Sequence, residues 1–235
     1  MKIFVYENYE EMSKHCAAIM LGEMTQDKHV NISPIAGKTP NRVYEILAEA
    51  VQGNEEAYKN VDYYIFDEAT DGDPVTQIEL EKSFFKPLQV KEEQIFTLTL
   101  DNYTNFAREI DYRGGMDLTL LGLGDNGHFC SNQPGTTEFL SDVYISEPKP
   151  EYEWYDIYKN YYGNNPMPIG FITVGASLVM KSKKLVMIVN GKLKAEAVKE
   201  LVEGKINENF PSSALKLHPN FVLLLDKEAA SLIDY

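Results

Sequence analysis

The chain has 235 residues, of which 44% are hydrophobic and 25% are charged, as in an ordinary globular domain. Its formal net charge of −14 argues against nucleic acid and anionic membranes as partners, because both require a basic surface. We expect no signal peptide, since the first residues soon turn acidic, and no membrane span, since apolar runs are short. The two cysteines, Cys16 and Cys130, lie far apart and outside metal-ligand spacing, which favours a reduced, cytoplasmic setting.

Strand and helix patterns alternate along the chain, which favours a mainly parallel sheet covered by helices. Thr39 and Pro40 open one helix, since threonine is a good N-cap and proline suits the first helical position. We see no repeat or linker and predict an α/β fold, with one Rossmann-like domain over 1–235 and helices on both faces of a mostly parallel sheet. The expected strands are 3–6, 30–33, 62–66, 116–121, 171–174, 185–189 and 221–225, and further helices are expected at 10–24 and 194–203.

The first candidate site is the turn between the strand 30–33 and the helix that follows it. Free backbone N–H groups and the helix dipole make such a turn, centred on Gly37, a natural anion site. Ser33, Lys38 and Thr39 add side-chain donors, although the spacing of a P-loop is absent. A well-capped helix without a ligand is the alternative interpretation.

The second candidate is the pair Asp67-Glu68, which follows the apolar strand 62–66. A carboxylate at the carboxyl edge of a sheet acts as a general base if its pKa suits that role. On this fragment alone, a helix cap or a solvated pair is the more economical interpretation.

The third candidate follows the strand 116–121, where three glycines in 122–127 lead to His128. Glycines allow a sharp bend and close approach to a ligand, and histidine exchanges a proton near neutral pH. His128 acting as acid or base is simpler than a nucleophilic Ser131 or Cys130, because neither lies in a G-x-S-x-G elbow. We expect no metal, since no second ligand lies at useful spacing, and a glycine-rich turn with a structural histidine is the alternative.

The segment 136–168 is rich in aromatic residues and ends in a turn of Gly, Asn and Pro at 163–166. An amphipathic helix packing its rings on the domain is the structural interpretation. A lid over the site, or a contact between subunits of a homo-oligomer, is the functional one. The aromatic residues are Tyr152, Trp154, Tyr155, Tyr158, Tyr161 and Tyr162.

Taken in this order, these segments resemble the superfamily of glucosamine-6-phosphate deaminases/isomerases and 6-phosphogluconolactonases. The resemblance implies that Asp67 is the base that transfers a proton and that Lys194 binds the substrate phosphate together with the 36–40 turn. It covers nearly the whole chain and is carried by the segments 36–40, 67–68, 124–128, 132–134, 173–175, 191–195 and 213–219.

Two positions depart from the deaminase pattern. Asn126 and Gln133 stand where the resemblance implies two carboxylates that support the ring-opening histidine. An amide does not stabilise an imidazolium as a carboxylate does, so we expect the pKa of His128 to lie lower than in a site flanked by carboxylates. Ser131 and the following Pro-Gly resemble the lactonases instead, whereas the arginine common after their Asp-Glu is Ala69 here.

The resemblance implies a sugar-phosphate isomerase or deaminase of carbohydrate metabolism, acting without a cofactor on a hexose or hexosamine 6-phosphate. In this hypothesis His128 assists ring opening and Asp67 moves a proton between C2 and C1. The alternatives are a 6-phosphogluconolactonase-like hydrolase, in which His128 activates water, and a catalytically weakened sugar-phosphate sensor. The sequence does not fix the sugar or the oligomeric state.

Overall fold

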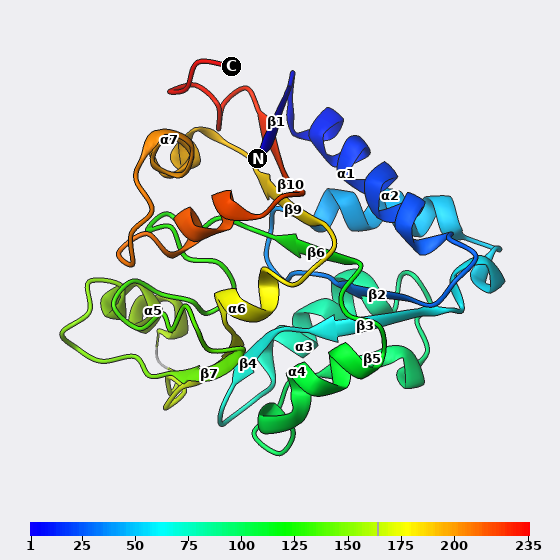
Figure 1. The fold of residues 1–235 in the computed structure, drawn as a ribbon, viewed down its shortest axis with the longest axis horizontal. Coiled ribbons are helices and arrows are strands. Elements are labelled where there is room, and N and C mark those ends of the chain that lie inside the picture. The colour runs from blue at the N-terminus through cyan, green and yellow to red at the C-terminus, as the bar shows by residue number, and fades with distance from the viewer. Residues whose placement is uncertain (164) are drawn as a thin grey trace.

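The computed structural model describes residues 1–163 and 165–235, without the side chains of Glu55 and Tyr161. Within these residues, seven strands form one parallel sheet that crosses the molecule (Figure 1). The predicted parallel α/β architecture is therefore confirmed. From one edge to the other, the strands are β1 (Lys2–Tyr6), β10 (Phe221–Asp226), β9 (Leu185–Val189), β6 (Leu118–Leu121), β2 (Val30–Ser33), β3 (Val61–Ile65) and β5 (Ile95–Thr97).

Both faces of the sheet are covered because the strands are apolar on both sides. Leu223 and Leu225 of β10 belong to one core cluster, while Val222 and Leu224 belong to the other, as the two-residue period of a strand requires. One face packs against α1 (Tyr9–Met24), α2 (Asn41–Val51) and the π-helical turn η2 (Glu81–Phe85), and the other against α4 (Tyr103–Tyr112), α6 (Ala176–Val179) and α7 (Ala195–Glu203).

The remaining helical elements are short. Among the described residues, no helix has both the length and the apolar composition that a bilayer span demands. These elements are α3 (Val75–Leu80), α5 (Tyr155–Tyr162) and the 3₁₀ turns η1 (Glu55–Tyr58), η3 (Glu92–Gln94), η4 (Lys192–Lys194) and η5 (Pro211–Leu217).

A second, antiparallel sheet lies beside the carboxyl end of the first. It consists of β4 (Asp67–Ala69), β8 (Phe171–Val174) and β7 (Val143–Ser146). The strand 171–174 was expected in the main sheet, and that placement is wrong. Every residue of β8 is buried, so its sequence has the apolar character of a parallel core strand although its partners are antiparallel.

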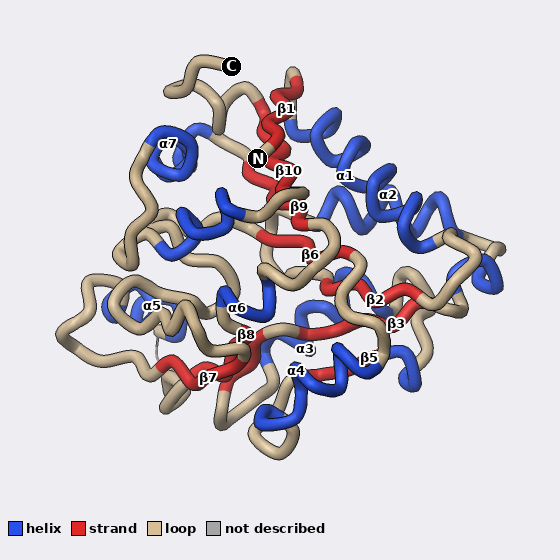
Figure 2. The backbone as a smooth tube through the Cα atoms, in the orientation of Figure 1, coloured by secondary structure: helices blue, strands red, loops and turns tan. Residues whose placement is uncertain are grey.

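The aromatic segment 136–168 contains a strand as well as a helix, so the expected single amphipathic helix is too simple. Figure 2 shows mostly loop around β7 and α5 in this part of the molecule. Trp154 is buried, stacks on Tyr152 and donates from Nε1 to the carbonyl of Pro134 at 3.0 Å, as the structural interpretation requires. Residue 164 of the expected terminal turn lies outside the described residues.

The start of α2 differs from its prediction. Pro40, not Thr39, occupies the N-cap position, and no side chain of α2 itself caps the helix. The Tyr9 hydroxyl, from α1, instead donates to the Thr39 carbonyl at 2.8 Å and accepts from the Arg42 N–H at 3.2 Å. This contact spans about thirty residues, which a local capping rule does not detect.

Candidate active site

The three turns singled out in the sequence meet at the carboxyl ends of the central strands, where ligands bind in open α/β sheets. A cavity of about 500 Å³ lies there. A second hollow, of about 270 Å³, shares Asp67, Glu79 and His128 with it and extends beneath α5. We call the two together the candidate site. Its expected members are Gly37, Lys38, Thr39, Asp67, His128 and Lys194.

Tyrosine contacts build the anion turn. The Tyr44 hydroxyl both accepts from the Ile35 N–H at 2.9 Å and donates to the Ile35 carbonyl at 2.7 Å. Gly37 adopts a φ of 118°, which a residue with a side chain rarely adopts. No described residue accepts from the backbone N–H of Lys38 or Thr39, so both remain available to an anion.

Ser33 is the one residue of the expected phosphate site that the structure does not bring into the candidate site. Its side chain is buried at the end of β2, and its hydroxyl donates to the Pro34 carbonyl at 3.4 Å. Ser33 is absent from the described residues that line either hollow. Its hydroxyl therefore supports the turn from below rather than facing a ligand.

Lys194 reaches the candidate site from the turn η4, between β9 and α7. Its ammonium donates to the Leu123 carbonyl at 2.8 Å and pairs with the Asp125 carboxylate at 2.7 Å. The Asp125 carboxylate thus pairs with Lys194, whereas Nδ1 of His128 is bound by Asn126 instead.

Asp67 and Glu68 have different tasks although they are adjacent. The Glu68 carboxylate accepts from the N–H groups of Ala69, Thr76 and Gln77 at 2.9–3.1 Å, so it caps the start of α3. The capping interpretation therefore holds for Glu68. Asp67 lines both hollows instead.

Asp67 has no cationic partner among the described residues; its Oδ2 accepts from the Ser131 hydroxyl at 2.9 Å. Burial raises the pKa of Asp67 to about 6, against the hydrogen bond from Ser131 and with the help of the adjacent negative charge of Glu68. A carboxylate in this range is ionised at neutral pH and still accepts a proton readily.

The glycine-rich turn brings His128 close to the backbone. The Gly124 N–H donates to the His128 carbonyl at 2.9 Å, and a Cβ on Gly124 would lie 1.9 Å from His128 Nδ1. Only glycine therefore allows the imidazole to lie across this turn. Gly127 has a φ of 82°, and a Cβ added to it would likewise clash with the ring of Phe210.

A chain of amides fixes the tautomer of His128. The backbone N–H of His128 donates to Asn126 Oδ1 at 3.2 Å, which orients this amide because a backbone N–H only donates. His128 Nδ1 lies 2.7 Å from the same oxygen and must carry the hydrogen, which leaves Nε2 of the neutral ring as the base. Asn126 Nδ2 in turn donates to Gln133 Oε1 at 2.9 Å.

This chain of hydrogen bonds continues to α5, since Gln133 Nε2 donates to the Tyr158 hydroxyl at 3.0 Å. We call Asn126 and Gln133 the amide relay. Asn126 and Gln133 do not appear among the described residues that line the hollows, so they position His128 from behind. Burial lowers the pKa of His128 to about 4, Lys194 acts in the same direction, and Asp125 opposes them. Burial and Lys194 are the physical causes of this lowered pKa, and the expected effect of the two amides stays a prediction.

Several lining residues were not singled out as site residues by the sequence. Ser131 was weighed as a nucleophile, and the structure instead shows it donating to Asp67. Its spacing from His128, shared with the lactonases, was the available signal. Glu79 and Thr76 come from α3, which carries no motif, so nothing in the sequence marked them as site residues. Tyr158 lies in the aromatic segment for which a lid over the site was the functional interpretation.

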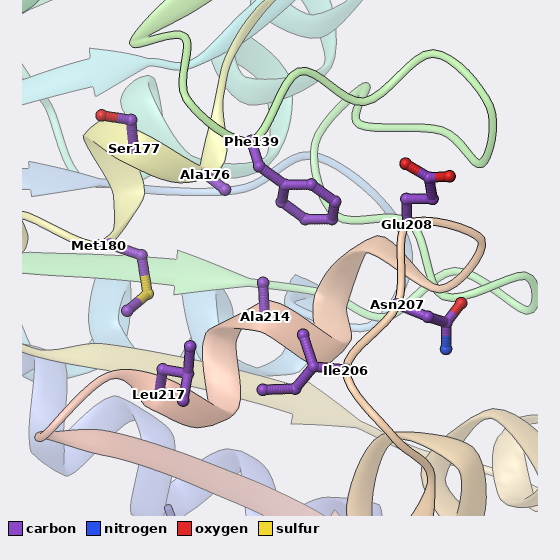
Figure 3. A pocket seen from close by; sticks show the side chains of 9 residues that line it. All are labelled: Phe139, Ala176, Ser177, Met180, Ile206, Asn207, Glu208, Ala214 and Leu217. Atoms are coloured by element: carbon purple, nitrogen blue, oxygen red, sulfur yellow. The ribbon is translucent and has the colours of Figure 1, made fainter.

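Another cavity, of about 570 Å³, lies away from these residues, between α6 and η5 (Figure 3). Apolar side chains such as Phe139, Met180 and Leu217 surround it, and Glu208 is the one ionisable group among its described lining residues. It therefore lacks the acid and base pair of the candidate site. The described residues also contain no group of three or more His, Cys, Asp or Glu side chains placed to hold a metal ion.

Comparisons with known proteins agree with the geometry. Residues 7–223 match the family model of glucosamine-6-phosphate isomerases/6-phosphogluconolactonase. The glucosamine-6-phosphate deaminase of Thermoanaerobacter pseudethanolicus is 31% identical, over 99% of this chain and 95% of the relative. Glucosamine-6-phosphate deaminase 1 of Bacillus subtilis is 29% identical, over 99% of both chains.

Two solved structures show the same fold over nearly the whole chain. A monomeric glucosamine-6-phosphate deaminase superposes with a TM-score of 0.88 and 29% identity, covering 99% of this chain and 100% of that one. The 6-phosphogluconolactonase from Trypanosoma brucei superposes with a TM-score of 0.74 and 18% identity, covering 99% and 98%.

Proposed function

The chain belongs to the family of glucosamine-6-phosphate isomerases and 6-phosphogluconolactonases, and on this premise we propose that it isomerises and deaminates a hexosamine 6-phosphate. The observation that carries the proposal is the meeting of an anion turn, Lys194, Asp67 and His128 around one cavity. A hexose 6-phosphate is the related substrate in which a hydroxyl replaces the amino group.

The phosphate binds at the end of the cavity formed by the anion turn and Lys194. The free N–H groups of Lys38 and Thr39, with the Lys194 ammonium, supply donors and positive charge in an otherwise acidic protein. This binding mode places C1 and C2 of the sugar near Asp67 and His128.

Asp67 transfers a proton between C2 and C1 of the open-chain sugar, which converts the C2 amine into an imine; water then hydrolyses the imine to the ketose phosphate and ammonia. The Asp67 carboxylate is ionised above pH about 6, so it accepts the C2 proton at neutral pH and returns it to C1. Ser131 positions the carboxylate through its hydroxyl.

His128 assists ring opening through Nε2, which accepts the proton of the C1 hydroxyl. The proton must then pass to the ring oxygen, and the imidazolium formed in between faces a neutral amide, not a carboxylate. We therefore infer that ring opening is slow in this protein. The open-chain form of the substrate should react faster than the closed-ring form.

We further propose that α5 serves as a lid within the single domain. Tyr158 and Ile157 of this helix line the hollow beside Asp67, and Tyr158 is hydrogen-bonded to the relay behind His128. Closure of this segment would shield the open-chain sugar from bulk solvent.

The direct test is a product assay with glucosamine 6-phosphate, in which released ammonium and ketose phosphate are measured together. Equal amounts of the two products are expected. Binding of the phosphosugar without either product contradicts the proposal and supports the sensor alternative.

Lactone hydrolysis is the second candidate, favoured by one observation. A neutral His128 whose Nε2 has no hydrogen-bond partner among the described residues is already in the form that activates water against a carbonyl. This reaction needs no C2 proton transfer, so hydrolysis of a 6-phosphogluconolactone that survives Asp67→Asn supports the lactonase.

A further inference from the structure

Glu79 lies at the junction of the two hollows of the candidate site. It belongs to α3, its side chain is half-buried, and it lines both hollows together with Asp67 and Thr76. The mechanism proposed above gives this residue no part. A carboxylate that lines a binding cavity is able to accept hydrogen bonds from a ligand through any oxygen that the protein leaves without a donor.

One of these oxygens is already bound by the protein. Glu79 Oε1 accepts from the Gly37 N–H at 2.9 Å, which ties the side chain to the anion turn. In the described part of the chain, Oε2 has no donor and no lysine, arginine or histidine pairs with Glu79. Glu79 is therefore a fixed acceptor with one oxygen left for a ligand.

Its position along the site identifies the part of the ligand that it meets. Gly37 belongs to the phosphate end of the cavity, whereas Asp67 and His128 mark the end at which C1 and C2 react. Because Glu79 is tied to Gly37 and shares both hollows with Asp67, it lies between these ends, beside the middle carbons of a 6-phosphosugar. These carbons carry hydroxyl groups, which donate to carboxylates.

We propose that Glu79 is a specificity-determining residue that accepts a hydrogen bond from the C3 or C4 hydroxyl of the sugar. This inference rests on the proposed function, because it places the phosphate at the anion turn. It predicts selection among sugars that differ in the presence or orientation of these hydroxyls, independently of the amino group at C2.

Glu79→Gln is the sharpest test because it preserves size and one acceptor oxygen. If the amide oxygen keeps the Gly37 N–H, the amide nitrogen faces the ligand and offers a donor in place of an acceptor. Calorimetric binding of glucosamine 6-phosphate should then weaken about 10- to 100-fold, the usual effect of a hydrogen bond to a charged group. Glu81→Gln is the matched control, since Glu81 lines neither hollow and faces Lys86 at 4.0 Å.

The 3-deoxy and 4-deoxy analogues of glucosamine 6-phosphate complete a double-mutant cycle. One of the two should bind Glu79→Gln and the parent equally, because the hydroxyl that Glu79 reads is already missing. Equal losses for all three sugars, or no binding by any of them, overturn the inference. Tighter binding of both the phosphosugar and inorganic phosphate to Glu79→Gln overturns it as well, since Glu79 then merely competes with phosphate for Gly37. If the binding energies of Glu79→Gln and of one deoxy analogue are coupled but the protein does not turn over glucosamine 6-phosphate, the proposed reaction is contradicted and this role of Glu79 is supported.

Discussion

Asp117 precedes β6 at the amino end of the parallel sheet, whereas Asp67 follows β3 at the carboxyl end. Asp117 is buried and accepts hydrogen bonds from Lys28, Lys183 and the Asn31 N–H at 2.8–2.9 Å. Burial alone raises the pKa of Asp117, but these donors outweigh it and lower the pKa. In the part of the chain that the structure describes, Asp67 has one neutral donor, Ser131, so burial prevails and raises its pKa.

The comparison separates two uses of a carboxylate in one fold. At the amino end of the sheet, lysines neutralise the charge of the Asp117 carboxylate, and their hydrogen bonds to it contribute to stability. At the carboxyl end, the charged form is disfavoured, which is unfavourable for folding and suits proton transfer. His128 follows the same rule, since its charged form is disfavoured by burial and by Lys194.

The largest expected effect is on turnover. Asp67→Asn should lower turnover of glucosamine 6-phosphate by about 10²- to 10⁴-fold, because the amide cannot accept the C2 proton. Asp117→Asn, which changes charge equally, should leave turnover near that of the parent. Steady-state assays of the two variants test this contrast, and similar losses in both would break it.

The two substitutions should also have opposite effects on stability. Asp67→Asn should raise the free energy of unfolding by about 2–3 kcal/mol at pH 7, from the difference between a folded pKa of about 6 and the unfolded value. This penalty is absent below pH about 4, where Asp67 is protonated in both states, and complete above the folded pKa.

Asp117→Asn should instead lower the free energy of unfolding by about 1–3 kcal/mol at pH 7, because hydrogen-bonded lysines lose their anion. Since the folded pKa is depressed, this contribution exists above the unfolded value of about 4 and is lost as pH falls through the folded pKa. Urea denaturation at pH 7 and in acid measures both variants. Effects of the same sign at pH 7 would contradict the comparison.

Lys194 is a lysine at the carboxyl end of the sheet, where we propose that it binds the substrate phosphate rather than neutralising a buried carboxylate such as Asp117. Lys194→Ala should weaken binding of a 6-phosphosugar about 10- to 100-fold through the loss of a charge-assisted hydrogen bond. The exposed Lys192, in the same turn and outside both hollows, provides the control Lys192→Ala. Calorimetry measures both, and unchanged affinity in Lys194→Ala removes this residue from the phosphate site.

The smallest expected effect concerns the amide relay. Asn126→Asp combined with Gln133→Glu should raise the pKa of His128, because the imidazolium gains an anionic partner. A tenfold change in its protonation equilibrium corresponds to about 1.4 kcal/mol. Ring opening of glucosamine 6-phosphate should become faster for the same reason. NMR titration of His128 alongside turnover checks this, and a parent value well above about 6.5 would contradict the account of a neutral histidine.

Much of the main sheet was predictable because strands that are buried at its centre have a recognisable local sequence. Strands such as β2, β3 and β9 are short apolar runs bounded by turn residues, and parallel order follows from the alternation with helices. The antiparallel sheet was not predictable in this way. β8 is apolar throughout, so its composition does not reveal whether its neighbours run parallel or antiparallel.

The site residues were predictable where a reactive or anion-binding residue lies in a turn at the end of a strand. Glycines before His128 and the Gly37 turn mark strand ends, and Asp67 follows an apolar run. Glu79 lies on a helix without a motif, and only the packing of α3 brings it to the cavity. The aromatic pattern around Tyr158 allowed a lid, but only the packing of α5 shows that this side chain reaches the cavity. The separate roles of Asp67 and Glu68 likewise depend on where α3 begins, which a dipeptide does not show.

Solvent deuterium exchange at C2 of glucosamine 6-phosphate tests most directly the claim that Asp67 is the base at the carboxyl end of the sheet. The account predicts that the parent incorporates deuterium at C2 faster as pH rises through about 6, where the pKa of Asp67 lies, and that Asp67→Asn incorporates none. Incorporation at the parental rate in Asp67→Asn, or a parent that hydrolyses 6-phosphogluconolactone without any exchange, would contradict the claim.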